Sequence, residues 1–370
     1  MQKVKLGDIC TKQSSAYAQK DLNDLEGEYP IYGASGFIKK INIYHQDKDY
    51  VAVVKDGAGI GRTMYLPAKS SVIGTLQYLI PKEGIEPKYL YYAVKSSHLE
   101  KYYTGATIPH IYFKDYQNEP IILYGKDEQI HVVSILEKVE KIIEIRKQEL
   151  KQLEELIKSR FVEMFGTLHD NKNGFDVVSI EAVCSLIKDG THQTPIYTED
   201  KNEGYKFLSS KDVMSQTIDW TNIKYIPAEL HEKLYATIKP QRNDILMSKN
   251  GVNYGVAAVN DTDEVFDIYV SLALLRPRDV IDPVFLRCVI NNPETKRQFD
   301  SSIKGIGVPN LHLGEIKKTK ILLPPKELQK VFVAFVKQLD KSKLIIQKSL
   351  DELETLNEAL MQKYFGGSGV

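Results

Sequence analysis

Cysteine is scarce in this sequence: Cys10, Cys184 and Cys288 are scattered among 370 residues, and none belongs to a CxxC pair. This spacing argues against a zinc site and favours a reducing compartment, so we expect a cytoplasmic protein. No run of about eighteen apolar residues occurs, which argues against a membrane-spanning helix. The first ten residues, MQKVKLGDIC, also lack the long apolar segment of a signal peptide.

Net charge is also absent, because 49 basic residues balance 49 acidic ones. A neutral chain gives no global reason to expect nucleic-acid binding, so such a function must rest on local patches. The length of 370 residues allows two or three domains with real hydrophobic cores.

Catalytic and cofactor motifs are missing as well. The glycine-rich run DGAGIGR, residues 56–62, continues as TMYLPAK, which has no helical period, so a dinucleotide-binding loop is not expected. The acidic-Pro-Pro-aromatic signature of an adenine methyltransferase does not occur. His192 and His231 are not part of an HExxH zinc helix. We therefore expect a protein without catalytic residues, metal or cofactor.

What the sequence does contain is a repeat. Residues 105–166 align with residues 305–366 without a gap, and 15 of the 62 positions are identical. Upstream, DYVAVVKDGAGIG matches DILMSKNGVNYG, and VKLGDIC matches VSIEAVC. The chain is thus a tandem duplication in which a variable segment precedes a well-matched one, and repeats of this kind determine the architecture.

Each well-matched segment predicts a long helix. Glycine is absent from 126–165 and from 326–365, and both stretches end at Phe-Gly, a helix stop signal. Apolar residues recur at three- and four-residue spacing, which predicts a coiled coil. Forty residues make a helix of roughly 60 Å. We expect the two helices to pack antiparallel about an internal pseudo-two-fold axis, with a globular domain toward each end.

The expected contacts between the helices come from both copies. Arg146 and Arg160 interrupt the first apolar pattern, and Lys343 and Asn357 interrupt the second, which favours one register of pairing. Two unassociated surface helices are the alternative. The predicted seam consists of Leu136, Ile143, Leu150, Leu153, Ile157, Val336, Ile346, Leu350, Leu353 and Leu360.

The variable segments predict α+β domains, because short β-rich runs alternate with turn residues and each segment closes with a helical stretch. Loops such as YGASGFIKK, VKDGAGIGR, KDGTHQTPIY, FLSSKD and MSKNGVNYG mix Lys or Arg with Ser, Thr, Asn, His and Gly. These residue types contact phosphates and base edges, although such loops also occur on surfaces without that role.

Two variable β-rich domains that alternate with two matched helices resemble the specificity subunit of type I restriction-modification systems. The residues that carry this resemblance are VKLGDIC and VSIEAVC, DGTHQTP at 189–195, the junctions at 105–111 and 305–311, the helix-entry phrases ILYGKDEQ and ILLPPKELQ, and the two helix phrases that end in Phe-Gly at 165–166 and 365–366. The helix-entry phrases are the most specific of these. The similarity covers residues 1–366 and leaves out the last four residues, GSGV.

The resemblance implies a non-catalytic reader of double-stranded DNA. Each target-recognition domain would read half of a bipartite site, and the helices would set the spacer and dock two modification (methyltransferase) subunits, to which restriction subunits attach. Such a complex acts as an adenine-specific methyltransferase and endonuclease. The implied division is 1–110, first recognition domain; 111–170, central spacer helix region; 171–310, second recognition domain; 311–366, C-terminal spacer helix region; and 367–370, flexible tail.

Candidate DNA contacts come from the polar loops. We expect Lys and Arg to hold phosphates, and Ser, Thr, Asn and His to read base edges. The candidates are Tyr32, Ser35, Lys39, Lys55, Asp56 and Arg62 in the first domain, and Thr191, His192, Thr194, Ser209, Lys211, Lys249 and Asn250 in the second. The alternatives are the specificity part of a related bipartite restriction-methylation enzyme of the IIB or IIG kind, and a coiled-coil scaffold that does not bind DNA.

Overall fold

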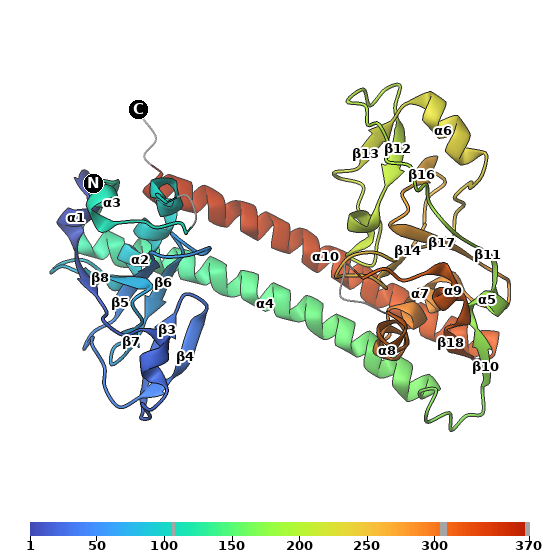
Figure 1. Ribbon diagram of the computed structural model, residues 1–370, viewed down its shortest axis with the longest axis horizontal. Helices are drawn as coiled ribbons and strands as arrows, with labels where there is room; N and C mark the ends of the chain where they lie inside the picture. Colours follow the sequence, from blue (N-terminus) through green and yellow to red (C-terminus); the bar gives the residue numbers. More distant parts are fainter. Residues whose placement is uncertain (106–107, 304–308, 367–370) are drawn as a thin grey trace. The chain divides into compact units, whose positions relative to one another are not determined.

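The computed structural model describes residues 1–105, 108–303 and 309–366. The chain forms two compact units, each traced in Figure 1: unit 1 consists of Met1–Glu149 with Ile346–Val370, and unit 2 of Leu150–Ile345. Parts of the two junction phrases, residues 106–107 and 304–308, and the tail 367–370 lie outside the described residues. Within the described ranges, no helix is long and apolar enough to cross a membrane.

The first domain is built from short strands and helices. In chain order they are β1 (Gln2–Lys5), α1 (Leu6–Ile9), β2 (Cys10–Ser14), the 3-10 helix η1 (Gln19–Leu22), β3 (Tyr29–Gly33), β4 (Gly36–Ile41), β5 (Tyr50–Val54), β6 (Thr63–Leu66), β7 (Ser71–Val72), β8 (Leu76–Pro81), α2 (Pro87–Ser96), η2 (Leu99–Tyr102), α3 (Phe113–Tyr116) and β9 (Pro120–Leu123). The long helix α4 (Lys126–Phe165) follows.

The second domain has a similar order of elements with one additional helix. Its elements are β10 (Asp176–Ser179), α5 (Ile180–Val183), β11 (Cys184–Asp189), β12 (Tyr205–Leu208), η3 (Ser210–Val213), β13 (Lys224–Ile226), α6 (Ala228–Tyr235), β14 (Ile245–Ser248), β15 (Ala257–Val259), β16 (Phe266–Ile268), β17 (Leu272–Pro277), α7 (Pro283–Ile290), α8 (Pro293–Ser302), α9 (Leu313–Lys318) and β18 (Lys320–Leu323). The second long helix is α10 (Lys326–Phe365).

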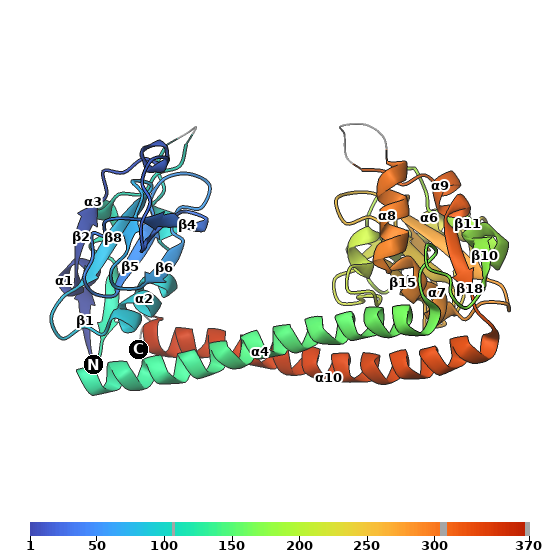
Figure 2. The same ribbon diagram turned by 90° about the horizontal axis from the view of Figure 1, so that it is seen from below.

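The two domains share one sheet topology. The first has a four-stranded sheet in the order β2-β8-β5-β6, seen in Figure 2, and a three-stranded sheet β4-β3-β7. The second has the matching orders β11-β17-β14-β15 and β13-β12-β16. A separate antiparallel pair, β1 with β9 and β10 with β18, ties the start of each domain to the strand just before its long helix. The repeat seen in the sequence is therefore a repeat of the fold.

One inner strand of each four-stranded sheet, β5 in the first domain and β14 in the second, is buried on both faces. Val51 and Val53 of β5 pack into the core beneath α2 and α4, while the alternate residues Tyr50, Ala52 and Val54 pack toward the three-stranded sheet. This division follows from the period of two along a strand. In β14 the same alternation divides Ile245 and Met247 from Leu246. Each domain thus has three layers: helices, a four-stranded sheet and a three-stranded sheet.

A buried glutamine fixes the first turn of each long helix. Gln129 donates to the carbonyls of Gly84 and Tyr124, and its Oε1 accepts from the Glu86 amide at 2.9 Å. Gln329 repeats these bonds to the carbonyls of Val280 and Pro324, and its Oε1 accepts from the Asp282 amide at 2.8 Å. These side chains satisfy the backbone groups in the loop before α2 or α7, which explains their identity in the two copies.

The helices pair antiparallel within each unit. In unit 1 the beginning of α4, at Val132 and Leu136, shares a core with Tyr364 and Phe365 at the end of α10. In unit 2 the end of α4, at Phe161 and Phe165, shares a core with the beginning of α10. Lys147–Glu354 in unit 1 and Lys343–Glu154 in unit 2 are ion pairs between the helices, at 2.7 and 3.7 Å. The prediction of an antiparallel pair is confirmed.

The predicted seam is buried to different degrees along the helices. Leu136, Val336 and Leu350 are fully buried. The other members are partly buried, namely Ile143, Leu150, Leu153, Ile157, Ile346, Leu353 and Leu360. Leu136 and Val336 belong to the domain cores, which cover the sides of these residues that the other long helix leaves open.

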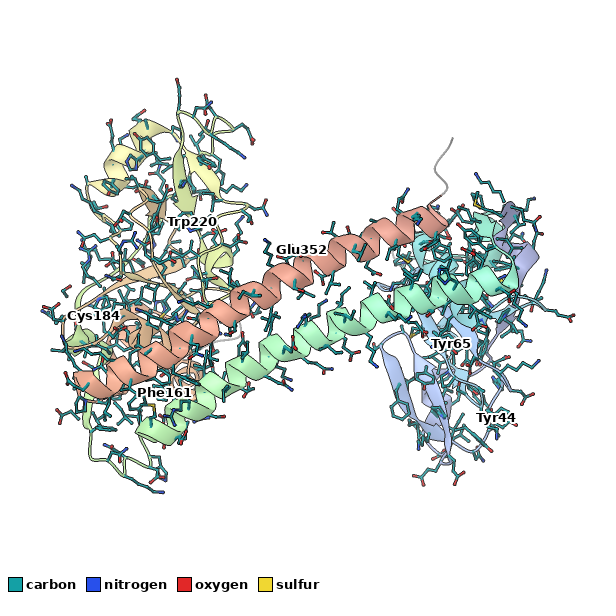
Figure 3. All side chains as sticks on the ribbon, turned by 180° about the vertical axis from the view of Figure 1, so that it is seen from behind. Tyr44, Tyr65, Phe161, Cys184, Trp220 and Glu352 are labelled. Atoms are coloured by element: carbon teal, nitrogen blue, oxygen red, sulfur yellow. The ribbon has the colours of Figure 1, made fainter. Side chains whose placement is uncertain are left out.

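Each domain core also contains aromatic residues from the long helix of the other repeat. Phe161, labelled in Figure 3, lies 5.7 Å from Phe285 and 5.6 Å from Phe332 between ring centres. In unit 1 the ring of Phe365 lies 5.2 Å from that of Tyr89. Each core therefore contains the beginning of its own helix and the end of the helix that belongs to the other repeat.

We expect Phe365→Ala to destabilise the N-terminal domain although the substitution lies at the C-terminal end of the chain. Loss of a buried phenylalanine side chain costs about 3–5 kcal/mol. Hydrogen exchange measured by mass spectrometry should then accelerate in β5 and remain unchanged in β14. Phe165→Ala should show the reverse pattern, and Leu344→Ala, at an exposed position, should change neither. Equal acceleration of both strands in Phe365→Ala would contradict this account of the cores.

Candidate nucleic-acid interface

A Lys-polar-Gly turn leaves the central strand of each domain at the same place. Lys55-Asp56-Gly57 follows β5, and Lys249-Asn250-Gly251 follows β14. Both glycines have a positive φ, +93° and +87°, a region in which residues with a Cβ atom are strained. The turns therefore have one backbone shape in both domains while the residue before each glycine differs.

The repeated junction phrase is held on this turn by backbone hydrogen bonds. The amide of Gly57 donates to the carbonyl of Pro109 at 3.0 Å, and the amide of Ile111 donates to Lys55 at 2.9 Å. In the second domain Gly251 donates to Pro309 at 3.0 Å, and Leu311 donates to Lys249 at 2.7 Å. We call this arrangement, two backbone bonds in each domain, the junction clamp. The clamp gives the junction phrase a structural reason to occur once in each domain.

Side chains meet across each clamp. Asp56 and His110 form an antiparallel bridge, and Nδ1 of His110 lies 2.7 Å from Oδ1 of Asp56. Asn250 and Asn310 form the equivalent bridge in the second domain. His110 and Asn310 are absent from the predicted contacts. The available signal was that they occupy the same position of the repeated phrase and are both polar, yet differ in type.

Three predicted residues of the first domain gather near the β3–β4 hairpin. Ser35 is exposed in the hairpin turn, and the guanidinium of Arg62 donates to the carbonyl of Ala34 at 3.0 Å. Tyr32 on β3 is partly buried beside Phe37, and burial raises the pKa of its hydroxyl. Lys39 is engaged elsewhere, because its ammonium donates to the carbonyl of Leu22 at 3.0 Å. The structure thus places Arg62 at the hairpin turn that contains Ser35. The ammonium of Lys39 is instead bound to the carbonyl of Leu22.

A charged cluster forms around Asp189 in the second domain. Its Oδ2 accepts from the ammonium of Lys249 at 2.8 Å and lies 3.2 Å from Nε2 of His192. Burial acts to raise the pKa of Asp189, but Lys249 and His192 outweigh it, so the pKa is lowered. Lys249 is only 4% exposed. Its predicted phosphate contact stays a prediction, but its charge is already paired within the protein.

The remaining predicted residues of the second domain lie on two segments. Thr191 bridges to Tyr269, and Thr194 is exposed in the loop that follows. Ser209 precedes η3, where its hydroxyl donates to Asp212 at 3.0 Å. Lys211 is exposed, and its ammonium donates to the carbonyl of Asn222 at 3.2 Å. Thr194 and His192 are the more accessible of these side chains, whereas Ser209 stabilises the start of η3.

The sequence pattern of a known family matches most of the chain. The pattern described as "Type I restriction modification DNA specificity domain" covers residues 1–155 and again residues 172–355. The chain belongs to this family. The two matches also correspond to the two copies of the repeat, so the family unit is one domain with its long helix.

Specificity subunits are among the relatives. The chain is 24% identical over 374 residues to the type I restriction enzyme MjaVIII specificity subunit of Methanocaldococcus jannaschii, covering 93% of this chain and 87% of that protein. It is 23% identical to the MjaIX specificity subunit of the same organism, over 78% of this chain and 70% of that protein.

Solved structures show the same fold. The S subunit of a type I restriction-modification system from M. genitalium aligns over 100% of this chain and 96% of its own, with a TM-score of 0.60 and 16% identity. A second chain, from a structure that describes the assembly and conformational transition of a type I restriction-modification system, aligns over 99% of this chain and 97% of its own, with a TM-score of 0.52 and 18% identity.

The matched lysines Lys55 and Lys249 should respond differently to substitution. We expect Lys249→Met to lower the free energy of unfolding by about 1–3 kcal/mol, because it leaves the partly buried Asp189 carboxylate unpaired. The side chain of Lys55 is 26% exposed and lies 3.9 Å from Asp56, so Lys55→Met should cost less than about 1 kcal/mol. Urea unfolding measures both values.

The effect of Lys249→Met should also depend on pH. A lowered pKa means that the ionised Asp189 contributes stability above the ordinary aspartate pKa, and this contribution is lost as pH falls through the folded value. The difference between Lys249→Met and the unmodified protein should therefore shrink in acid. A difference that stays constant down to the acid range would show that the ion pair is not its source.

Proposed function

We propose that each domain reads one half of a bipartite double-stranded DNA site, that the paired helices set the spacer between the half-sites, and that the helices dock methyltransferase subunits. The observation that carries the proposal is the junction clamp. One backbone frame occurs in both domains, at the start of the long helix region, and presents a different pair of polar side chains in each.

DNA reading is supported by the chemistry of the exposed loops around the first clamp. Arg62 and Lys55 supply positive charge for phosphates, while Ser35 and Asp56 supply groups that can bond to base edges. In the second domain the exposed residues Thr194 and His192, on a loop, and Lys211, on η3, offer the same combination. Because the chain has no net charge, these local groups rather than a global field would determine where DNA binds.

A fixed spacer is supported by the helices themselves. Each is a single helix of 40 residues, and each is held at both ends by a domain core. Half-sites that a protein reads through two rigidly spaced elements are separated by a distance that the protein geometry sets. A pair of continuous helices is suited to that role, since neither contains a proline or glycine at which it could bend.

The proposal that the helices dock two methyltransferase subunits is supported by exposed apolar residues at matched positions of the two helices. Ile145 of α4 and Leu356 of α10 are 42% and 45% exposed in unit 1, and Leu156 and Ile345 are 46% and 71% exposed in unit 2. The second pair is the first pair moved by one repeat, with the two helices exchanged. Exposed apolar residues of this kind mark protein contacts more often when they are grouped than when they are scattered.

Methylation mapping tests the proposed function. The chain is co-expressed with a type I modification subunit in cells whose DNA lacks adenine methylation, and single-molecule sequencing records every methylated adenine. We expect one motif made of two short half-sites with a fixed unread gap. A contiguous motif, or methylation that does not change when this chain is replaced by another specificity subunit, would contradict the proposal.

Substitution of the apolar pair should separate docking from folding. We expect Ile145→Asp with Leu356→Asp to weaken association with the modification subunit by at least about 10-fold, as loss of central apolar contacts does at interfaces. Size-exclusion chromatography with light scattering measures the complex. Ile130→Asp is the matched control, because Ile130 is equally exposed but is replaced by Lys330 in the second copy. Equal weakening by both changes would argue against these two positions as the docking site.

A further inference from the structure

The two junction clamps differ in side chains and not in backbone. The bond from the glycine amide measures 3.0 Å in both domains, and the returning bond measures 2.9 Å in the first and 2.7 Å in the second. Residues that face each other in an antiparallel bridge project their side chains to the same side. Position 56 is therefore a neighbour of position 110, and position 250 is a neighbour of position 310.

The side chains are not needed to hold the clamp. Asp56 and His110 are joined by a hydrogen bond in the first domain, whereas two amides occupy these positions in the second and the same backbone bonds form. A pair whose only task was to fix the loops would have no reason to change type while the loops keep their geometry. The difference between the pairs points instead to something outside the protein that differs between the two domains.

The pair in the first domain presents a hydrogen-bond acceptor. The carboxylate of Asp56 can only accept, so Nδ1 of His110 donates to it, and in the tautomer that carries its proton on Nδ1 the other ring nitrogen, Nε2, is an acceptor. The His110 side chain is 35% exposed and that of Asp56 is 29% exposed, so a ligand can reach both. In the major groove such an acceptor fits the exocyclic amino group of cytosine or adenine.

The pair in the second domain presents amides. Asn310 is exposed, and its side chain carries both donors and an acceptor, the combination that bonds adenine at N6 and N7. Oδ1 of Asn250 is buried and has no hydrogen-bond partner among the residues that the structure describes. A buried acceptor without a donor costs about 1–3 kcal/mol, and such groups in native proteins call for a specific explanation. A donor supplied by a rearranged Asn310 amide would remove that cost.

We propose that His110, positioned by Asp56, and Asn310, positioned beside Asn250, are the side chains that determine the preferred base at one position of each half-site. This proposal rests on the proposed DNA-reading function and adds to it two specificity-determining residues and the kind of base edge that each accepts. His110 selects a base with an exocyclic amino group, and Asn310 selects adenine.

The test uses the full chain together with the modification subunit and reads the methylated motif of each variant. We expect His110→Ala to reduce the preference at one position of the first half-site by about 10-fold or more, the lower range for a lost base contact. The second half-site should be unchanged. Asn310→Ala should give the reverse result, so each variant serves as the control for the other half-site.

A second variant guards against loss of folding. His110→Asn places in the first clamp the residue that the second clamp already carries, so the loop bonds should form, and the preferred base should shift toward adenine. His131→Ala, a change of an exposed histidine on α4, should leave the motif unaltered.

An unmodified chain that gives no split motif would reject the DNA-reading function itself. An intact split motif that none of the three clamp variants alters, or a uniform loss of methylation at all sites without a change of motif, would overturn the specificity role alone.

Discussion

The exchange of helix ends is the constraint on which the rest of the structure depends. Phe161 and Phe165 close the core of unit 2 from the end of α4, and Tyr364 and Phe365 close the core of unit 1 from the end of α10. Neither helix can gain or lose a residue freely, because one residue turns the helix by about 100° and would rotate these rings out of their cores. Helix length, helix register and domain stability are therefore one property of the chain, and the equal lengths of the two helices follow from it.

The domains divide their residues between a constant frame and variable side chains. Gln129 and Gln329 make the same buried bonds, and the junction clamps repeat their backbone geometry. These groups bond to backbone, so they work whatever loop sequence lies between them. The side chains that this frame presents differ between the two domains, as His110 and Asn310 do. A protein that must keep its assembly while it changes what it reads needs this separation, since a change in an exposed side chain costs little stability.

The sequence predicted the features that depend on local pattern. The repeat, both 40-residue helices and their antiparallel pairing could be read from periodicity and from the absence of glycine and proline. Burial along the seam could not, because Leu350 is buried and Leu150 only partly so although both occupy the same heptad position. The pairing of Lys249 with Asp189, 60 residues apart, and of Asp56 with His110, 54 residues apart, was equally out of reach. Such contacts depend on which strands become neighbours, and residue type alone does not encode that.

Charge pairing also limits what this chain can contribute to DNA affinity. Basic and acidic residues cancel, and Lys249, Lys39 and Lys211 are each engaged by a group of the protein. Most of the affinity of a protein for duplex DNA comes from cations that release counterions from phosphates. A chain without net positive charge therefore gains less binding energy that is independent of base sequence than a basic one would. That property suits a subunit whose task is to choose among sites, because sequence-independent affinity stabilises every wrong site as much as the right one.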